Sequence, residues 1–188
     1  EEAVYEEKKM EEMEVCFLMD RFGYMKLIDK NAYERNKEAV HNENKYVFNC
    51  MNTDKICIFT DTGKMHTIKA VDIPLGRFRD KGTPVDNLSN YDSSQERMLY
   101  VAPVGQLRSD RLLFVTKTSM CKLVEGAEFD VAKRTIASTK LADEDELIFI
   151  GSASEMEQIV LQSHGGCFLR FLTQEVSTMK KLHLVCGA

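Results

Sequence analysis

The sequence has no long hydrophobic run. It contains 188 residues, of which 44% are hydrophobic and 29% charged, and no apolar stretch approaches the roughly 20 residues that a membrane-spanning helix requires. It also contains no P-loop, G-x-S-x-G, H-E-x-x-H or EF-hand pattern. The composition is that of a soluble globular protein long enough to bury a sizeable core.

No pair among the six cysteines has the C-x-x-C spacing, and the four histidines are scattered along the chain. A zinc site would need clustered ligands of these types. Most of the cysteines lie within apolar segments, where cysteine behaves as a small hydrophobic residue. We therefore expect reduced core thiols in a cytoplasmic protein, and neither a metal nor a cofactor bound by these residues.

Three features that could suggest chemistry have simpler explanations. Gly165 and Gly166 beside His164 lie in a hairpin pattern, where glycine supplies a turn with positive φ. The acidic run at residues 143–146 lacks the spacing of metal ligands and is typical of a solvated turn. Tyr24 and Tyr33 have no base beside them in the sequence. The sequence therefore predicts no catalytic residue.

Acidic charge is concentrated at the start of the chain. The formal net charge is −5, and residues 1–14 alone carry −5, since they hold seven Glu against Lys8 and Lys9. Residues 15–188 are neutral as a whole. We expect residues 1–14 to form an acidic, solvated linker. The remaining body is neither the basic domain that a nucleic-acid partner favours nor an acidic one.

The strongest pattern is a hairpin that occurs four times. Its clearest copy is KICIFTDTGKMHTIK at residues 55–69, where two alternating strands flank an Asp-Thr-Gly turn. The other copies lie at residues 15–28, 112–122 and 158–172. The turn residues Gly23, Gly63, Ser119 and Gly166 are separated by 40, 56 and 47 positions. Periods of this size, each with about four short strands, are typical of blades arranged around an axis.

No segment has a sustained helical period, so we predict an all-β fold. We expect further strands at residues 47–51, 97–104 and 135–141, and a buried strand at residues 147–150. The predicted fold is a propeller-like disc of about four-stranded blades over residues 15–188. Four blades are counted. Because the chain starts with Glu and stops abruptly after Val-Cys-Gly-Ala, we expect an incomplete or shortened disc, cut from a longer chain.

The link after the second hairpin has a distinctive composition. Residues 70–88 contain two Pro and two Gly, which disfavour regular structure across the span. Arg77, Arg79 and Lys81 alternate within it, so an extended chain would project all three cations to one side. An ordinary solvated loop and a contact with backbone phosphates are both compatible with this pattern.

Several of these stretches, taken in order, resemble the C-terminal domain of the A-type subunits of DNA gyrase and topoisomerase IV, the type IIA topoisomerases. The resemblance covers about residues 15–188, and its most specific part is the Pro…Arg…Gly-x-Pro-x-x-Asn-Leu stretch after the second hairpin. The residues that carry it are Gly23-Tyr24-Met25-Lys26, Phe59 to Lys64, Ile73-Pro74 with Arg77, Gly82, Pro84 and Asn87-Leu88, Phe114 to Lys117 with Lys122, Lys140-Leu141 with Asp145 to Leu147, and Gly166 with Arg170-Phe171.

The resemblance implies a β-pinwheel, a disc of five or six propeller-like blades whose basic rim holds or wraps duplex DNA. It implies a bacterial, cytoplasmic, nucleoid-associated parent enzyme that uses ATP and Mg and assembles from A-type and B-type subunits as a heterotetramer. The cutting tyrosine and the ATPase would lie outside these residues. The gyrase form has a Gly- and Arg-rich box near residues 33–40, and this chain lacks it. That departure favours a topoisomerase IV-like or divergent gyrase-like parent.

We expect DNA binding that is independent of sequence, through Lys and Arg contacts to phosphates. A propeller-like protein-interaction module with little DNA affinity is the alternative that the neutral body permits. The candidate DNA-binding residues follow the hairpin turns and their links: Lys26, Arg35, Lys64, Arg77, Arg79, Lys81, Lys117, Lys122, Lys133, Arg134 and Arg170.

Overall fold

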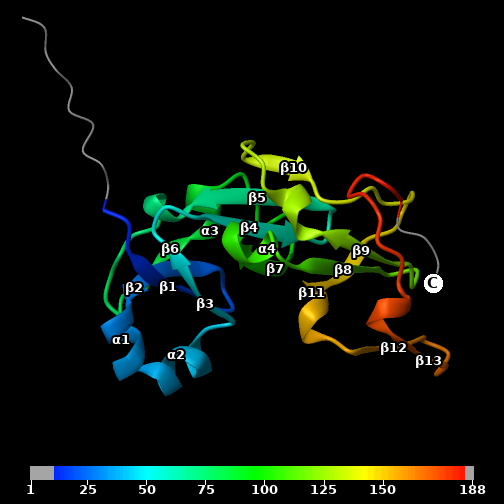
Figure 1. The fold of residues 1–188 in the computed structure, drawn as a ribbon, viewed down its shortest axis with the longest axis horizontal. Helices are drawn as coiled ribbons and strands as arrows, with labels where there is room; N and C mark the ends of the chain where they lie inside the picture. Colours follow the sequence, from blue (N-terminus) through cyan, green and yellow to red (C-terminus); the bar gives the residue numbers. More distant parts are fainter. Residues whose placement is uncertain (1–10, 185–188) are drawn as a thin grey trace, which may run out of the picture.

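The computed structural model describes residues 11–184 as a series of small antiparallel sheets joined by loops and short helices (Figure 1). In chain order the strands are β1 (Glu14–Met19), β2 (Tyr24–Asp29), β3 (Tyr46–Met51), β4 (Lys55–Thr60), β5 (Lys64–Lys69), β6 (Thr83–Pro84), β7 (Met98–Pro103), β8 (Arg111–Thr116), β9 (Cys121–Glu125), β10 (Thr135–Ala137), β11 (Leu147–Ser152), β12 (Gln158–Gln162) and β13 (Phe168–Leu172).

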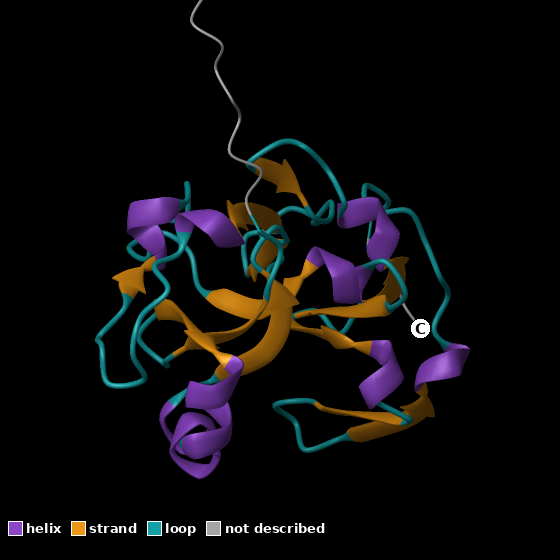
Figure 2. Cartoon of the chain, turned by 60° about the vertical axis from the view of Figure 1, so that its left-hand side comes forward, coloured by secondary structure: helices purple, strands orange, loops and turns teal. Residues whose placement is uncertain are grey.

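Helical segments are short and lie between the strands (Figure 2). They are α1 (Lys30–Arg35), α2 (Lys37–Glu43), α3 (Val85–Leu88), α4 (Val104–Leu107) and the 3₁₀ turns η1 (Ala70–Asp72), η2 (Gly126–Phe129), η3 (Ala153–Glu155) and η4 (Thr173–Glu175). None of the helices among residues 11–184 has the length and apolar character needed to cross a membrane.

All four predicted hairpins are confirmed: β1–β2, β4–β5, β8–β9 and β12–β13 pair antiparallel. The four turn residues have left-handed backbones, with φ of 82° at Gly23, 75° at Gly63, 66° at Ser119 and 79° at Gly166. A left-handed residue is strained unless it lacks a Cβ or is small and polar. The turns therefore select glycine or serine, and this selection makes the four hairpins recognisable in the sequence.

The first three hairpins are extended on both sides by the same rule. The strand that follows the hairpin joins its first strand, as β3 joins β1, β7 joins β4 and β11 joins β8. The link after the next hairpin then returns to the second strand, as β6 joins β2 and β10 joins β5. In the third sheet this place is taken by a parallel bridge between Leu123 and Thr178. Each of these three sheets is therefore completed by residues of the next repeat, which interlocks consecutive blades.

The core lies between successive sheets. On β4, Ile56 and Ile58 pack in a cluster shared with the first sheet, whereas Cys57 and Phe59 pack in a cluster shared with the third. Residues of a strand alternate between its two faces, so both faces of β4 are buried. This two-sided burial explains why the strand reads as a nearly continuous apolar run, and it is the packing expected of blades stacked side by side.

The links depart from the sequence predictions in detail. Residues 29–46 hold α1 and α2, for which the sequence shows no periodic signal; Asp29 caps α1 by accepting a hydrogen bond from the Ala32 amide. The expected strand at residues 135–141 is only the three-residue β10. The strand at 147–150 forms, but Ile148 and Phe149 are exposed rather than buried. Of the expected acidic linker at residues 1–14, residues 1–10 lie outside the described residues, and Glu14 already begins β1.

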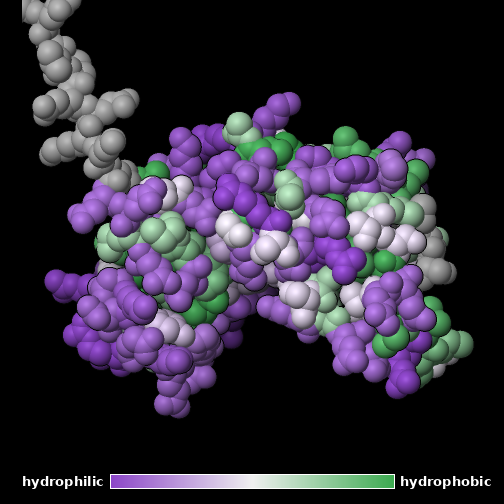
Figure 3. Space-filling model, viewed as in Figure 1, coloured by the Kyte–Doolittle hydropathy of each residue, from purple (hydrophilic) through white to green (hydrophobic). Residues whose placement is uncertain are grey.

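The four units form an open arc. In Figure 1 the first sheet with α1 and α2 lies at the left end, and the β12–β13 hairpin lies at the lower right. Figure 3 shows a hollow between these two ends. The fourth unit consists of its hairpin alone within residues 11–184, with β12 and β13 paired only to each other. The all-β, propeller-like prediction of about four blades is confirmed, with this reduced fourth blade.

Candidate nucleic-acid interface

The loop at residues 77–81 presents three cations on a firmly anchored backbone. It leaves a parallel bridge between Leu75 and Leu27 and returns as β6, which pairs with β2. Gly82 makes the return possible, because its φ is 83° and a Cβ there would lie 2.6 Å from the carbonyl oxygen of Met25. The loop is thus held at both ends by the second strand of the first hairpin.

The backbone of this loop is a turn rather than an extended chain. The Asp80 amide donates to the Arg77 carbonyl at 3.1 Å, and the Asp80 carboxylate accepts from the Arg77 amide at 2.7 Å. The alternation that we expected from an extended chain is therefore wrong. Phe78 instead packs against the buried cluster that contains Val40, which leaves Arg77 and Arg79 exposed on either side of it.

Two lysines are associated with this loop: Lys26 binds its backbone, and Lys81 is its last residue. The Lys26 ammonium donates to the carbonyl oxygens of Phe78 and Asp80, at 2.5 and 2.6 Å. Burial lowers the pKa of Lys26, and the carboxylates of Asp80, Glu43 and Asp20 only partly oppose this effect. Lys81 is exposed and lies over the Tyr24 ring, 4.6 Å from its centroid.

A second pair of predicted cations lies on the next link. Lys133 and Arg134 are exposed, and Arg134 donates to the Leu88 carbonyl at 3.0 Å. Leu88 ends α3, which directly follows the first basic loop and β6. The contact connects the two basic links: residues 77–81 lie just before β6 and α3 in the chain, and Arg134 binds the last residue of α3.

The other exposed predicted cations are dispersed. Two of them form ion pairs, Lys64 with Glu96 at 3.6 Å and Lys117 with Glu146 at 3.3 Å. Arg35 lies on α1 and donates to the Asn31 carbonyl, and Arg170 lies on β13 opposite Val160. The structure therefore does not gather all of the predicted residues in one place.

Lys122 has a different position from the one that we expected. It is fully buried, and its ammonium donates to the carbonyls of Lys181 and His183 at 2.8 Å each, with Lys180 at 3.5 Å. A buried ammonium requires such acceptors, and these come from chain about 60 positions away, so the strand pattern could not reveal them. Lys122 thus lies inside the domain and not on a DNA-facing rim.

Sequence reasoning missed a group of cations at the base of the second hairpin. Lys55 and Lys69 are directly opposite in the β4–β5 register, and with Arg134 they line a surface cavity of about 170 Å³. Like charges in opposite positions of a sheet are unfavourable, and Asp130 offsets this by pairing with Lys55 at 3.2 Å. The available signal was that lysine occupies both ends of the same hairpin.

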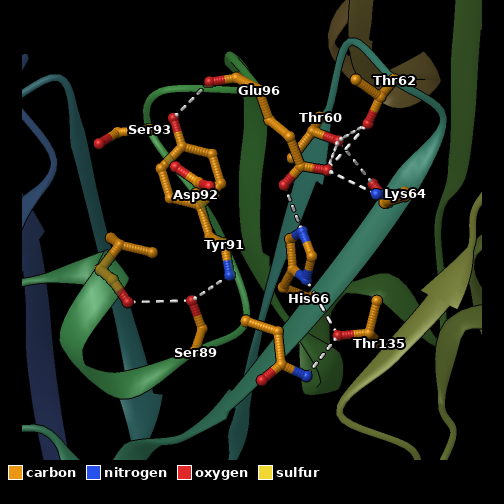
Figure 4. Close-up of polar contacts among 12 residues, drawn as sticks. Thr60, Thr62, Lys64, His66, Ser89, Tyr91, Asp92, Ser93, Glu96 and Thr135 are labelled. Atoms are coloured by element: carbon orange, nitrogen blue, oxygen red, sulfur yellow. Dashed lines mark hydrogen bonds and ion pairs between the residues drawn. The ribbon is translucent and has the colours of Figure 1, made fainter.

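A buried polar cluster supports the second hairpin (Figure 4). Glu96 accepts hydrogen bonds from His66 at 2.6 Å and from Thr62 at 2.9 Å. The other ring nitrogen of His66 lies 3.0 Å from the Thr135 hydroxyl on β10. Burial alone would raise the pKa of Glu96, but these hydrogen bonds and the nearby Lys64 charge outweigh it and lower the pKa. The cluster therefore ties β5, β10 and the 91–97 loop together around a carboxylate.

We expect this carboxylate to make the domain acid-sensitive. The folded-state pKa of Glu96 lies below its ordinary value of 4.5, so its stabilising contribution is present above that pH and is lost as the pH falls through the lowered pKa. Urea unfolding between pH 7 and pH 3 should show a less stable Glu96→Gln variant at pH 7, with a smaller loss of stability on acidification. The exposed Glu157→Gln substitution should follow the wild type at every pH. Parallel pH profiles for wild type and Glu96→Gln would contradict this expectation.

The side chains offer little chemistry beyond charge. Burial raises the pKa of Cys57 and of Cys50 to about 12, which leaves both thiols protonated and unreactive at neutral pH. No three His, Cys, Asp or Glu side chains between residues 11 and 184 are grouped so that they could hold a metal ion. What the described surface can provide is a set of cations for binding an anionic polymer.

Comparison with known proteins shows which proteins this chain is similar to. The family model for the DNA gyrase C-terminal domain, beta-propeller, matches residues 54–93 and 110–154. The DNA gyrase A-type subunit of Streptococcus pneumoniae serotype 4 is 27% identical over 94% of the chain, and that of Lawsonia intracellularis is 25% identical over 88%. The chain spans only 23% and 22% of the length of these relatives.

Solved structures agree with the sequence comparison. The C-terminal domain of DNA topoisomerase IV superposes with a TM-score of 0.78 at 20% identity, covering 95% of this chain and 57% of that one. The resemblance to the C-terminal domain of the A-type subunit of type IIA topoisomerases is confirmed. The E. coli ParC C-terminal domain follows with a TM-score of 0.70 at 13% identity, covering 93% of this chain and 70% of that one. The DNA gyrase A C-terminal domain has a TM-score of 0.52 at 17% identity, covering 90% and 58%. This topoisomerase C-terminal fold accounts for the four hairpins and their interlocked sheets.

Proposed function

We propose that this chain holds duplex DNA, without regard to sequence, for a bacterial ATP-dependent type IIA topoisomerase. The observation that carries the proposal is the loop at residues 77–81, where three exposed cations stand on an anchored backbone. Cations on fixed backbone can neutralise phosphates without first losing conformational freedom, and phosphate contacts do not discriminate between bases. Lys133 and Arg134 add two further exposed cations on the next link.

The parent enzyme that we propose has A-type and B-type subunits in a heterotetramer in the cytoplasm, near the nucleoid. ATP and Mg would be used by that assembly, and the chemistry of strand cleavage would lie outside residues 1–188. In this proposal residues 1–188 bind DNA and take no part in the chemistry. Within the described range they include no metal-ligand cluster, and Tyr24 lies under Lys81 as a packing partner.

We propose further that the parent is topoisomerase IV-like or a divergent gyrase. Where the Gly- and Arg-rich box of the gyrase form would stand, this chain has α1 and α2, with Val40 buried against the first sheet. The cations of this segment, Arg35 and Lys37, are engaged with the Asn31 carbonyl and the Tyr33 ring. We therefore expect the domain to hold DNA without imposing a wrap of fixed handedness.

A protein-docking role is the second candidate, and a groove favours it. A cavity of about 800 Å³ lies between the third sheet and the β12–β13 hairpin. Ile148, Phe149 and Val160 line it and are each more than 40% exposed. Exposed apolar side chains gathered in a concave surface are typical of docking sites.

A fluorescence anisotropy titration with a random-sequence duplex separates the two functions. DNA holding predicts binding that weakens steeply between low and moderate salt, because counterions are released from the duplex on binding. Binding that is absent, or that does not respond to salt, would overturn the DNA proposal and leave the docking module. A poly-glutamate competitor of matched length serves as the control for non-specific polyanion binding.

A further inference from the structure

One position recurs inside the hairpins. It lies three residues after the turn residue, and it is Lys26 after Gly23, His66 after Gly63 and Lys122 after Ser119. The position lies on β2, β5 and β9. β2 and β5 have a partner strand on each side, and β9 has β8 on one side and the Leu123–Thr178 bridge. A lysine in such a place is unusual, since its charge must find acceptors within the protein.

Both lysines find acceptors of the same kind at the same spacing. Lys26 donates to the carbonyls of Phe78 and Asp80, and Lys122 donates to those of Lys181 and His183. In each case the carbonyls are two residues apart and belong to the loop that leaves the following hairpin. The bridges that precede them are also alike, Leu27 with Leu75 and Leu123 with Thr178. The same arrangement therefore occurs twice: a strand lysine donates to two carbonyls of the loop that arrives from the next repeat. We call this arrangement a clasp.

The first clasp acts on the loop that carries the exposed cations. Phe78 and Asp80 lie between Arg77, Arg79 and Lys81 in the sequence, so fixing these two carbonyls fixes the backbone from which the three cations project. The Lys26 ammonium also lies 5.4 Å from the centroid of the Phe78 ring, which is the residue that seats the loop on the core. The half-buried Lys26 thus directs two of its donors at carbonyls of the loop.

We propose that Lys26 is a positioning residue for DNA binding, which holds the 77–81 loop in its binding shape rather than contacting phosphate. The proposal rests on the DNA-holding function proposed above. It assigns the charge of Lys26 to the loop backbone and the phosphate contacts to Arg77, Arg79 and Lys81. Loss of the ammonium would release the loop while leaving its three cations in the chain.

The second clasp provides a matched control. Lys122 makes the equivalent pair of carbonyl contacts in its own blade, but the loop that it holds has Lys180 paired with Glu128 at 3.3 Å and Lys181 donating to the Glu128 carbonyl. Lys26→Met and Lys122→Met each remove one charge from an equivalent clasp. Of the two loops, only the one held by Lys26 carries three exposed cations that form no ion pair among residues 11–184.

The test measures two quantities on the 188-residue chain: the slope of log K against log salt for a random duplex, and amide hydrogen exchange at residues 76–84. A phosphate contact is worth about 0.9 in the slope. We expect Lys26→Met to lower the magnitude of the slope by about 2 to 2.7 and to speed exchange of the loop at least tenfold. Arg79→Ala, a direct contact, should lower the slope by about 0.9 with unchanged exchange. Lys122→Met should leave the slope within about 0.9 of wild type.

Three results would overturn the proposal. A loss of about 0.9 in slope with unchanged loop exchange would make Lys26 itself a phosphate contact. An unchanged slope with a mobile loop would give Lys26 a purely structural role. Equal slope losses for Lys26→Met and Lys122→Met would indicate general destabilisation. If Lys26→Met does not fold, Lys26→Gln takes its place, since an amide can still donate to one of the two carbonyls.

Failure of the underlying function has a different signature. If the wild-type chain shows no salt-sensitive binding, the DNA-holding function fails, and with it the role of Lys26 in DNA binding. The exchange measurement would still report whether Lys26 holds the loop.

Discussion

Replacing Arg77, Arg79 and Lys81 together with alanine is expected to lower the magnitude of the slope of log K against log salt by about 2.7. Each of the three cations is exposed, and none of them forms an ion pair among the described residues. A cation that neutralises one phosphate releases counterions worth about 0.9 in the slope, and three such contacts add. The backbone anchors of the loop, at Phe78, Asp80 and Gly82, are untouched by these substitutions.

The control removes the same charge elsewhere. Lys30, Arg97 and Arg108 are each paired with a carboxylate, Lys30 with Glu14, Arg97 with Asp61 and Arg108 with Asp130. Their triple alanine variant changes the net charge equally, so it reports the effect of the overall field. We expect it to change the slope by less than about 1. Equal losses in the two triple variants would mean that net charge, and not the 77–81 loop, determines binding.

Phe59→Ala is expected to destabilise the domain by about 3–5 kcal/mol, the range typical of truncating a buried phenylalanine. Phe59 is fully buried on β4, and its ring lies 4.9 Å from Phe129 and 6.3 Å from Phe114 between ring centroids. Phe114 belongs to the third sheet and Phe129 to the link that follows it. The substitution would leave a cavity between consecutive blades. The neighbouring strands cannot close it by moving, because their other faces pack against further sheets.

Urea or thermal unfolding measures this loss, with Phe22→Ala as the comparison. Phe22 is 73% exposed in the first hairpin turn, so its replacement should change the free energy of unfolding by less than about 0.5 kcal/mol. A change below about 1 kcal/mol for Phe59→Ala would contradict the inter-blade core described above. Two separate transitions in the variant would show that the blades unfold independently.

The repeated hairpins were predictable because their signals are local. Alternation of side chains and a turn residue that tolerates positive φ lie within a dozen positions, as at Gly63 with φ of 75°. The completion of each sheet was not predictable in the same way. The pairing of β10 with β5 joins residues that are about 70 positions apart, and nothing in the three residues Thr135–Ala137 specifies that partner.

The candidate site was only partly predictable for a related reason. The composition of residues 70–88 correctly drew attention to an irregular basic link, but an alternating pattern suggested extended chain where Asp80 builds a turn. Lys122 shows the other limit. Whether a lysine in an apolar strand points to solvent or to carbonyls is decided by chain that returns much later, here at Lys181 and His183. Ile148 and Phe149 are exposed because they line a groove, which a buried-strand pattern cannot distinguish from a core.

The most direct test of DNA holding is amide hydrogen exchange of the chain with and without a random duplex at low salt. If the chain holds DNA through its basic links, protection should appear at residues 76–84 and 132–135, and should decline as salt is raised. The groove between β11 and β12, around Phe149 and Val160, should exchange equally in both states. Protection confined to that groove, or no protection of residues 76–84, would contradict the account.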